Sequence, residues 1–195
     1  MDTQAKFDKY EQMLREWNSH INLVAHGTLD DIKTRHFADS AQLAEYIPKN
    51  SQILDMGSGA GFPGTVLAIM GYNVTCIESI GKKCRFLEAL KTELRLDNLT
   101  VINDRVENVI NSIPRIPNSE LIFTARAFAP LSKILALISL RKDIKKSRLF
   151  LLKGRQIMDE IESAKTRSDF EYKLHASKTG DGFILDVNLD SFHVK

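Results

Sequence analysis

A run of glycines directly after an apolar segment is the part of this sequence best suited to chemistry. The strand-like segment 52–56, with Ile53, Leu54 and Met56, leads straight into Gly57, Gly59 and Gly61. Glycine tolerates a positive φ and lets a ligand approach the backbone closely. Pro63, just beyond, suits the first turn of a helix, where no amide hydrogen bond is lost. A strand, a glycine-rich turn and a helix in this order predict the loop that binds a nucleotide-type cofactor.

The position of the glycines relative to the strand separates two cofactor classes. In dinucleotide-binding folds a G-x-G-x-x-G string directly follows the strand, and the pyrophosphate lies at the helix N-terminus. Residues 59–64 fit that string but start late, and Asp55 at the strand end would repel a pyrophosphate. The same carboxylate suits the amino group and sulfonium neighbourhood of S-adenosyl-L-methionine, directly or through water. The loop therefore favours the methyl donor, and a dinucleotide-dependent oxidoreductase stays open as the alternative.

Further acidic residues follow the next two predicted strands. Glu78 closes the strand after the glycine loop, 21 residues beyond Gly57, where a carboxylate can accept both ribose hydroxyls of an adenosine. Asp104 and Glu107 follow the strand after that, and we expect the edge of adenine to lie there, beside the backbone of Val106. These residues extend the predicted cofactor site across three strand ends.

The strands and helices that position these residues can be predicted from residue 52 onward, where short apolar runs alternate with helix-length stretches. Strands alternating with helices predict a parallel sheet with helices on both faces. The tail differs, because 172–177 and 183–188 flank the turn 180–182 and predict an antiparallel hairpin. We expect the remaining strands at 52–56, 73–78, 100–103, 120–125 and 148–153, and helices at 63–70, 82–96 and 130–140.

Two helices are predicted before the first strand. Residues 5–21 carry apolar side chains at steps of three and four, the spacing of an amphipathic helix. A second helix is predicted from Thr28 to Tyr46, because Thr28 and Asp31 form a string like a capping box. The expected fold is an α/β domain over 1–195, with an N-terminal helical extension (1–50) and a cofactor-binding core (51–195) that holds a mostly parallel, seven-stranded sheet.

Composition excludes several classes of protein. With 195 residues, 43% of them hydrophobic, and a net charge of +2, the chain can bury one core and is neither disordered nor fibrous. Its longest apolar run, 134–140, ends at two basic residues and is too short to span a bilayer. The charged N-terminus does not match a signal peptide, so we expect a cytoplasmic protein. Cys76 and Cys84 lack metal-type spacing and are expected to be buried free thiols, without a metal site.

Several short strings spread over residues 10–190 match one known family. They are Trp17-Asn18, Asn22-Leu23, Arg35-His36, Asp39-Ser40, the loop Asp55–Gly64, Glu78-Ser79, Lys82, Phe86-Leu87, Arg105–Glu107, Arg126–Ala129 and Leu152–Gly154. On these strings the chain resembles the bacterial 16S ribosomal RNA guanine-N7 methyltransferases, also called glucose-inhibited division protein B.

The resemblance implies a Rossmann-like, S-adenosylmethionine-dependent methyltransferase fold and a substrate in 16S ribosomal RNA or the small ribosomal subunit precursor, namely N7 of guanine 527 in the customary numbering. Guanine N7 has an in-plane lone pair and no proton, so its attack on a methyl group needs no general base. We expect a monomer; a non-catalytic ribosome-assembly factor with the same fold is the second alternative. Together with Gly59 and Glu78 from the spacing above, the resemblance completes the expected cofactor site with Gly57, Phe62, Val106, Glu107 and Arg126.

Basic residues are expected to contact the RNA at the edge of the sheet where the parallel strands end. Arg126 follows the strand 120–125 and should emerge at this carboxyl edge, where ligands bind in open α/β folds. Segment 133–155 holds eight Lys and Arg against one acidic residue. Its cluster 141–148 precedes a strand, so we expect it at the opposite edge, as solvated surface or a second RNA contact. The cations expected to contact phosphates or bases at the active edge are Arg35, Lys82, Lys83, Arg126 and Lys153.

Overall fold

The computed structural model describes all residues from 1 to 195, and strands alternate with helices through most of the chain. The strands are β1 (Gln52–Met56), β2 (Asn73–Glu78), β3 (Leu99–Asn103), β4 (Leu121–Arg126), β5 (Ser147–Lys153), β6 (Ser168–Ala176) and β7 (Phe183–Val194). The helices are α1 (Thr3–Asn18), α2 (Asp39–Ala41), α3 (Gly64–Ile69), α4 (Gly81–Leu94), α5 (Val106–Val109), α6 (Leu131–Ser139) and α7 (Ile157–Lys165).

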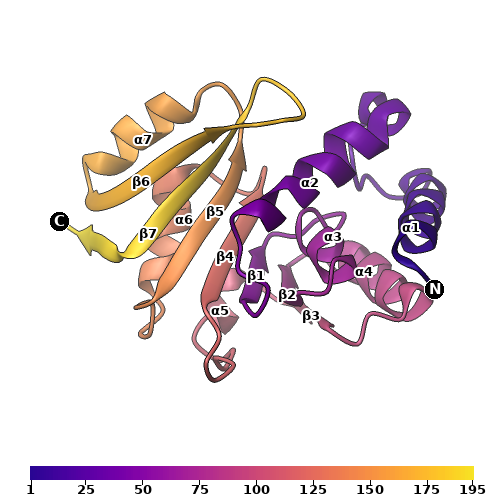
Figure 1. The fold of residues 1–195 in the computed structure, drawn as a ribbon, viewed down its shortest axis with the longest axis horizontal. Coiled ribbons are helices and arrows are strands. Elements are labelled where there is room, and N and C mark those ends of the chain that lie inside the picture. Colours follow the sequence, from indigo (N-terminus) through magenta and orange to yellow (C-terminus); the bar gives the residue numbers. More distant parts are fainter.

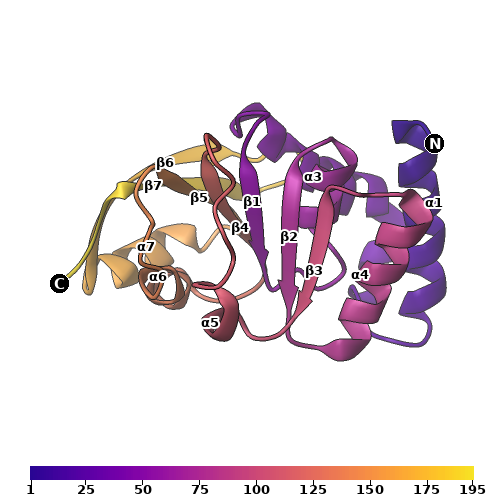
Figure 2. The same cartoon turned by 90° about the horizontal axis from the view of Figure 1, so that it is seen from below.

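All seven strands form one sheet in the order β3-β2-β1-β4-β5-β7-β6, and Figure 2 shows them side by side. Strands β1 to β5 pair in parallel, whereas β7 runs antiparallel to both β5 and β6. The strand order reverses between β1 and β4, the position at which open α/β sheets form their ligand crevice. The predicted fold class, a mostly parallel seven-stranded sheet with an antiparallel C-terminal hairpin, is confirmed.

Helices cover both faces of the sheet and create two apolar cores (Figure 1). Helices α1, α3 and α4 pack over one face, and α5, α6 and α7 over the other. Successive residues of a strand point to opposite faces, so Ile53 belongs to the first core and Leu54 to the second. The sheet is thus buried on both sides at its centre, and its exposed functional groups are restricted to the strand ends.

Helix α1 joins the N-terminal extension to the glycine loop. It begins at Thr3, where the Asp2 side chain accepts a hydrogen bond from the Ala5 amide. Tyr10, on the apolar face of α1, is fully buried, and its hydroxyl donates to the Ala60 carbonyl at 2.6 Å. The extension therefore supports the loop directly rather than forming a separate unit.

The prediction of one continuous helix from Thr28 to Tyr46 is wrong. The structure has a 3₁₀ segment (His26–Asp31), a π-helical turn (Lys33–Ala38), the short α2 and a second 3₁₀ segment (Gln42–Glu45). Thr28 does not cap a helix: its hydroxyl donates to the Ala25 carbonyl and meets Nε2 of His36 at 2.9 Å. The hydrogen bonds of Thr28 with Ala25 and His36 thus override the local helical pattern.

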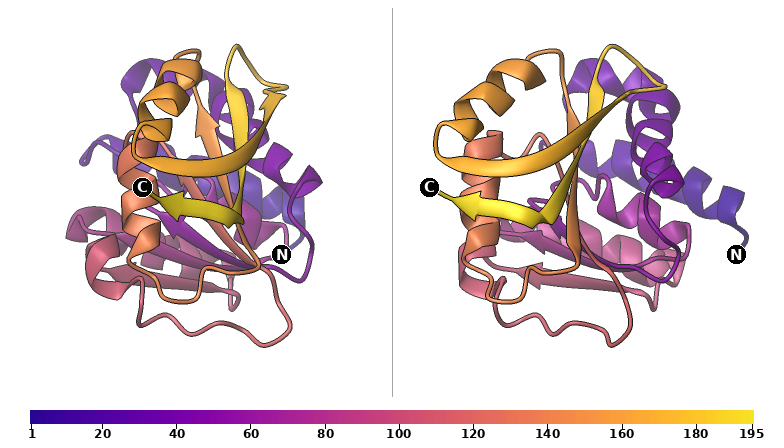
Figure 3. Two further views of the ribbon diagram at one scale, coloured as in Figure 1. Left: turned by 90° about the vertical axis from the view of Figure 1, so that its left-hand side faces the viewer. Right: turned by 60° about the vertical axis from the view of Figure 1, so that its left-hand side comes forward.

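The C-terminal hairpin is longer than the sequence predicts. Strand β6 starts before residue 172 and β7 continues past residue 188, so that the hairpin curves away from the sheet in Figure 3. Helix α7 was not predicted. The hairpin turn contacts the N-terminal extension, where the Thr179 hydroxyl donates to Oδ1 of Asp39 at 2.9 Å. Residues 140 positions apart in the sequence are joined by this contact.

Cys76 and Cys84 are buried free thiols, as predicted. None of the helices combines the length and the apolar composition required to traverse a bilayer.

Candidate active site

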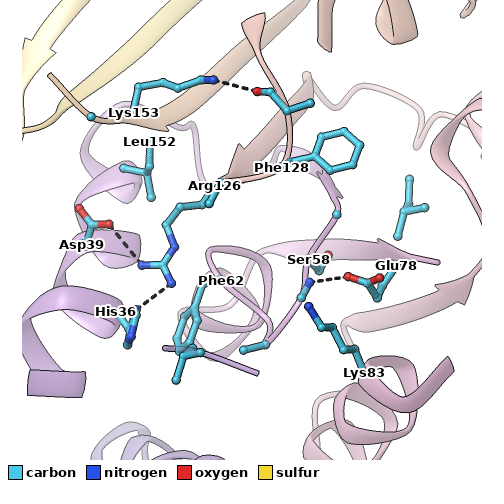
Figure 4. Close-up of a pocket in the computed structure, with 18 of the residues that line it drawn as sticks. His36, Asp39, Ser58, Phe62, Glu78, Lys83, Arg126, Phe128, Leu152 and Lys153 are labelled. Carbon is cyan, nitrogen blue, oxygen red and sulfur yellow. Dashed lines mark hydrogen bonds and ion pairs between the residues drawn. The ribbon is translucent and has the colours of Figure 1, made fainter. Parts of the chain in front are cut away.

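A cleft of about 1170 Å³ opens at the carboxyl edge of the parallel strands. Segments that follow each of the five parallel strands line it, together with the N-terminal extension and the hairpin turn. Figure 4 shows side chains from these segments converging on the cleft. Every predicted cofactor residue lines it: Gly57, Gly59, Phe62, Glu78, Val106, Glu107 and Arg126.

The glycine loop forms one wall of the cleft. Gly57 and Gly59 have φ values of +69° and +58°, which side chains with a Cβ rarely adopt. A Cβ added to Gly57 would collide with the ring of Phe128, which lies over it. The loop is held from below by Tyr10 and from the side by Glu78, so it is a pre-formed surface.

Glu78 lies at the end of β2 with its carboxylate fixed in the cleft. Oε2 accepts from the Gly59 amide at 2.9 Å and Oε1 accepts from the Ile80 amide at 2.8 Å. Each carboxylate oxygen can accept more than one hydrogen bond. The group therefore retains acceptor capacity for hydroxyl donors while it ties β1 and β2 together.

Asp55 has a different place from the one expected. Its carboxylate is fully buried and does not line the cleft. Oδ2 accepts from the Gly64 amide at 3.1 Å, and Oδ1 accepts from the Thr124 hydroxyl at 3.0 Å. Burial raises the pKa of Asp55 to about 6, because the charged carboxylate loses its hydration. The expectation that it faces the amino group of a bound donor is wrong; it fixes the loop from beneath.

The segment after β3 supplies the next part of the wall. Val106 is buried at the start of α5, and Glu107 beside it is exposed and 3.7 Å from Arg105. Asp104 accepts hydrogen bonds from the Asn108 side chain and the Arg105 amide, which lower the pKa of its carboxyl. An apolar surface next to backbone and carboxylate groups is the environment that a purine ring requires.

Arg126 leaves the end of β4 and points to the N-terminal extension. Its Nη1 donates to the Arg35 carbonyl at 2.9 Å and lies 3.4 Å from Oδ2 of Asp39. Its Nη2 donates to Nδ1 of His36 at 2.8 Å, and its guanidinium lies 4.7 Å from the centre of the Phe62 ring. Phe62 thus supports the cation through its π face.

His36 is a neutral partner of this arginine. Burial, and next the charge of Arg126, lower the pKa of His36 to about 4. Because Arg126 donates to Nδ1, the proton of the neutral ring resides on Nε2, which donates to the Thr28 hydroxyl. His36 is therefore a neutral, hydrogen-bonded structural group of the cleft.

The predicted RNA-contacting cations differ in whether their side chains are held by partners in the chain. Arg35 and Lys83 line the cleft, and Lys82 is exposed just outside its lining. Lys153 is held: its Nζ donates to the Ala129 carbonyl at 2.9 Å and to Oε2 of Glu160 at 2.7 Å. Lys153 is therefore fixed in the lining of the cleft by two partners in the chain.

The basic cluster 141–148 lies at the opposite end of β5, as predicted, but it is not uniformly solvated. Arg141 is only 4% exposed and donates to the Ile110 carbonyl. Arg148 is ion-paired with Asp186. Both cations have structural partners, so only the lysines of this cluster remain as exposed charge.

Sequence reasoning missed two groups of the cleft, Glu160 and the contact between Asp39 and Thr179. Asp39 was noted only as part of a family string. Oδ1 of Asp39 accepts from both the Gln42 side chain and the Thr179 hydroxyl. No local pattern marks a contact between segments so distant in sequence, and Glu160 lies on a helix that was not predicted.

The residues present fit S-adenosylmethionine. The cradle at Gly57 admits no Cβ, the Glu78 carboxylate can accept from ribose hydroxyls, and Val106 offers an apolar side chain between charged neighbours. These features adjoin in the order in which the methionine, ribose and adenine parts of the molecule are linked.

Solved structures of other proteins share this fold. An O-methyltransferase from Bacillus cereus in complex with SAH is 15% identical, with a TM-score of 0.60 over 93% of this chain and 90% of that one. A variant of MtNAS in complex with S-adenosylmethionine is 12% identical, with a TM-score of 0.60 over 95% of this chain and 75% of that one. At such identities the likeness establishes the architecture alone.

Sequence relatives cover nearly the whole chain. Ribosomal RNA small subunit methyltransferase G of Rickettsia prowazekii is 38% identical over 94% of this chain and 92% of the relative. Its counterpart from Orientia tsutsugamushi (strain Ikeda) is 39% identical over 96% and 91%. The GidB family profile, described as rRNA small subunit methyltransferase G, matches residues 3–181. The chain therefore belongs to the GidB family of S-adenosylmethionine-dependent small subunit rRNA methyltransferases.

Proposed function

We propose that the protein methylates N7 of one guanine in 16S ribosomal RNA, guanine 527 in the customary numbering. The observation that carries this proposal is the pair of cations at the ends of neighbouring strands. Arg126 ends β4 opposite Leu152 of β5, and Lys153 follows directly. Both line the cleft beside the glycine loop. N7 needs its lone pair for the attack, so O6 is the neighbouring acceptor that a cation can contact, whereas adenine presents an N6–H₂ donor at that place.

The reaction requires little acid–base chemistry from the protein. When bound, S-adenosylmethionine supplies an electrophilic methyl group. Guanine N7 attacks through its lone pair and releases no proton, so the neutral His36, with both ring nitrogens hydrogen-bonded, has no proton to move. What the chain must supply is alignment of the two reactants and a surrounding that tolerates the charge transferred to the base.

The rigid part of the cleft provides this alignment. We assign donor binding to Gly57, Gly59 and Glu78, with the adenine between Val106 and Glu107. Phe62 contributes as the support of Arg126, since its ring carries the guanidinium. Arg126 is held by the extension as well as by β4, so its direction is set before the RNA arrives.

The RNA backbone is assigned to the freer cations around the mouth. Arg35, Lys82 and Lys83 flank the cleft on its N-terminal and α4 sides. Lysine and arginine side chains of this kind neutralise phosphates and orient the strand, while specificity comes from base contacts.

Incubation of small-subunit RNA or subunits with the protein and methyl-labelled S-adenosylmethionine tests the proposal. We expect 7-methylguanosine as the labelled nucleoside. Label on another nucleoside would refute the guanine-N7 assignment, and bound donor without transfer to any RNA would favour the non-catalytic assembly factor. The dinucleotide-dependent oxidoreductase is not retained, because the family uses S-adenosylmethionine.

A further inference from the structure

An ion pair on the floor of the cleft has open hydrogen-bonding positions. Lys153 extends from the end of β5, and Glu160 reaches it from α7, with Nζ and Oε2 2.7 Å apart. The two side chains are 11% and 30% exposed, and both line the cleft. The pair is thus partly desolvated but accessible to a ligand.

The partners of each group show what remains free. Oε2 of Glu160 accepts from Lys153 and from the Leu131 amide at the start of α6. Oε1 of Glu160 accepts no hydrogen bond from the chain. Lys153 uses two of its three N–H donors, on Glu160 and on the Ala129 carbonyl. One donor and one acceptor therefore remain side by side in a fixed geometry.

The other carboxylates of the cleft are less suited to a second ligand. Both oxygens of Asp39 are engaged, by Gln42 and Thr179 on one and Arg126 on the other. Glu78 belongs to the glycine-loop wall. On the Arg126 side of the cleft, Glu160 is thus the carboxylate with an unengaged oxygen.

A donor next to an acceptor is complementary to one edge of guanine. Going from N7 around the ring, guanine presents the O6 acceptor and then the N1–H and N2–H₂ donors. Adenine presents an N6–H₂ donor and then the N1 acceptor, which is the reverse order. A lysine followed by a carboxylate matches guanine and opposes adenine.

We propose that Glu160 selects the target base by accepting from N1–H and N2–H₂ of guanine while Lys153 donates to O6. This inference rests on the proposed function and adds a specificity-determining residue to it. The carboxylate also faces the ring as N7 gains its methyl group and positive charge, which it stabilises.

Inosine at the target position tests this role, because it keeps O6 and N1–H and lacks N2–H₂. The loss of a hydrogen bond to a charged group at a desolvated site lowers the affinity about 10- to 100-fold. We expect the wild-type protein to favour the guanosine RNA over the inosine RNA by that factor in kcat/KM. Glu160→Gln should bring the ratio close to one, since its amide oxygen is needed by Leu131 and Lys153 and its NH₂ then faces N2–H₂.

Asp159→Asn is the matched control, because Asp159 is an exposed neighbour on α7 without a partner in the chain. It should keep the wild-type ratio. Where turnover of Glu160→Gln is too slow, the ratio of the dissociation constants of the two RNAs, measured with S-adenosylhomocysteine present, gives the same comparison.

The outcomes separate the two proposals. A wild-type protein that methylates guanine N7 without preferring guanosine over inosine, or a Glu160→Gln variant that keeps the wild-type preference, overturns the role of Glu160 alone. A wild-type protein that methylates no guanine at N7 overturns the proposed function and this inference with it.

Discussion

Asp55→Asn should stabilise the protein at neutral pH, although it removes a charge that accepts two hydrogen bonds. The Asp55 carboxylate is fully buried, and its pKa rises from 3.8 to about 6. Asparagine fits the same contacts, because its oxygen can accept from the Gly64 amide and its NH₂ can donate to the Thr124 hydroxyl. The substitution therefore removes a buried ionisable group and keeps a hydrogen bond to each partner, with the Thr124 hydroxyl now the acceptor instead of the donor.

The magnitude follows from proton linkage. A pKa that is higher in the folded state stabilises the fold fully below pH 3.8, and this contribution is lost as the pH rises through about 6. At about 1.4 kcal/mol for each pH unit, the loss amounts to about 3 kcal/mol by pH 7. Asparagine does not titrate, so the free energy of unfolding of the variant does not show this loss.

Urea denaturation of both proteins at pH 4 and pH 7 measures this effect. The free energy of unfolding of the variant, relative to wild type, should rise by up to about 3 kcal/mol between the two pH values. Other carboxyl groups titrate equally in both proteins and cancel in the difference. A difference that stays constant with pH would refute the assignment of Asp55 as a buried, proton-retaining support of the loop.

Three further substitutions test binding of the cofactor and binding of the RNA. Gly57→Val should abolish S-adenosylmethionine binding, measured by calorimetry, because valine neither adopts the φ of +69° nor fits beneath Phe128. Glu78→Ala should weaken the same binding by about 1 to 3 kcal/mol, the scale of unpaired charged hydrogen bonds. Lys82→Ala should lower the slope of log affinity for RNA against log salt by about 0.7, the value for one phosphate contact on a single strand.

Each of these changes has a control. Circular dichroism must show the folded protein in the Gly57 and Glu78 variants; folded variants with unchanged donor affinity would remove these residues from the cofactor site. Lys145→Ala, at the opposite end of β5, should leave the salt slope unchanged. If Lys145 rather than Lys82 alters the slope, the RNA lies on the other edge of the sheet.

Local patterns in the sequence were enough to predict the sheet and the strand-end residues. Strands β1 and β2 have the predicted limits, because a short, mostly apolar segment that ends at a glycine or an acidic residue has few other interpretations. The position of Glu78 follows from those limits, and that of Arg126 from the end of the predicted strand 120–125, since the end of a parallel strand must lie at the carboxyl edge. The strand that a residue ends therefore predicted that it lines the cleft.

The failures share a physical cause, namely contacts between distant segments. Asp55 satisfies the same strand-end rule as Glu78, yet Gly64 and Thr124 enclose it, and nothing near it in the sequence indicates this. Thr28 has the local pattern of a helix cap, but its hydroxyl forms a hydrogen bond with the more distant His36 instead. Periodicity reports which face of an element is apolar, whereas burial of a single polar group depends on the whole fold.

Methyl transfer to N7 of one guanine is detected by chemical mapping of the RNA. N7-methylation makes the ribose–base bond labile to reduction and aniline, so 16S RNA treated with the protein and S-adenosylmethionine should break at a single new position, guanine 527. RNA treated with Gly57→Val should remain intact. Cleavage at another guanine, or a methyl group that gives no cleavage, would contradict the account.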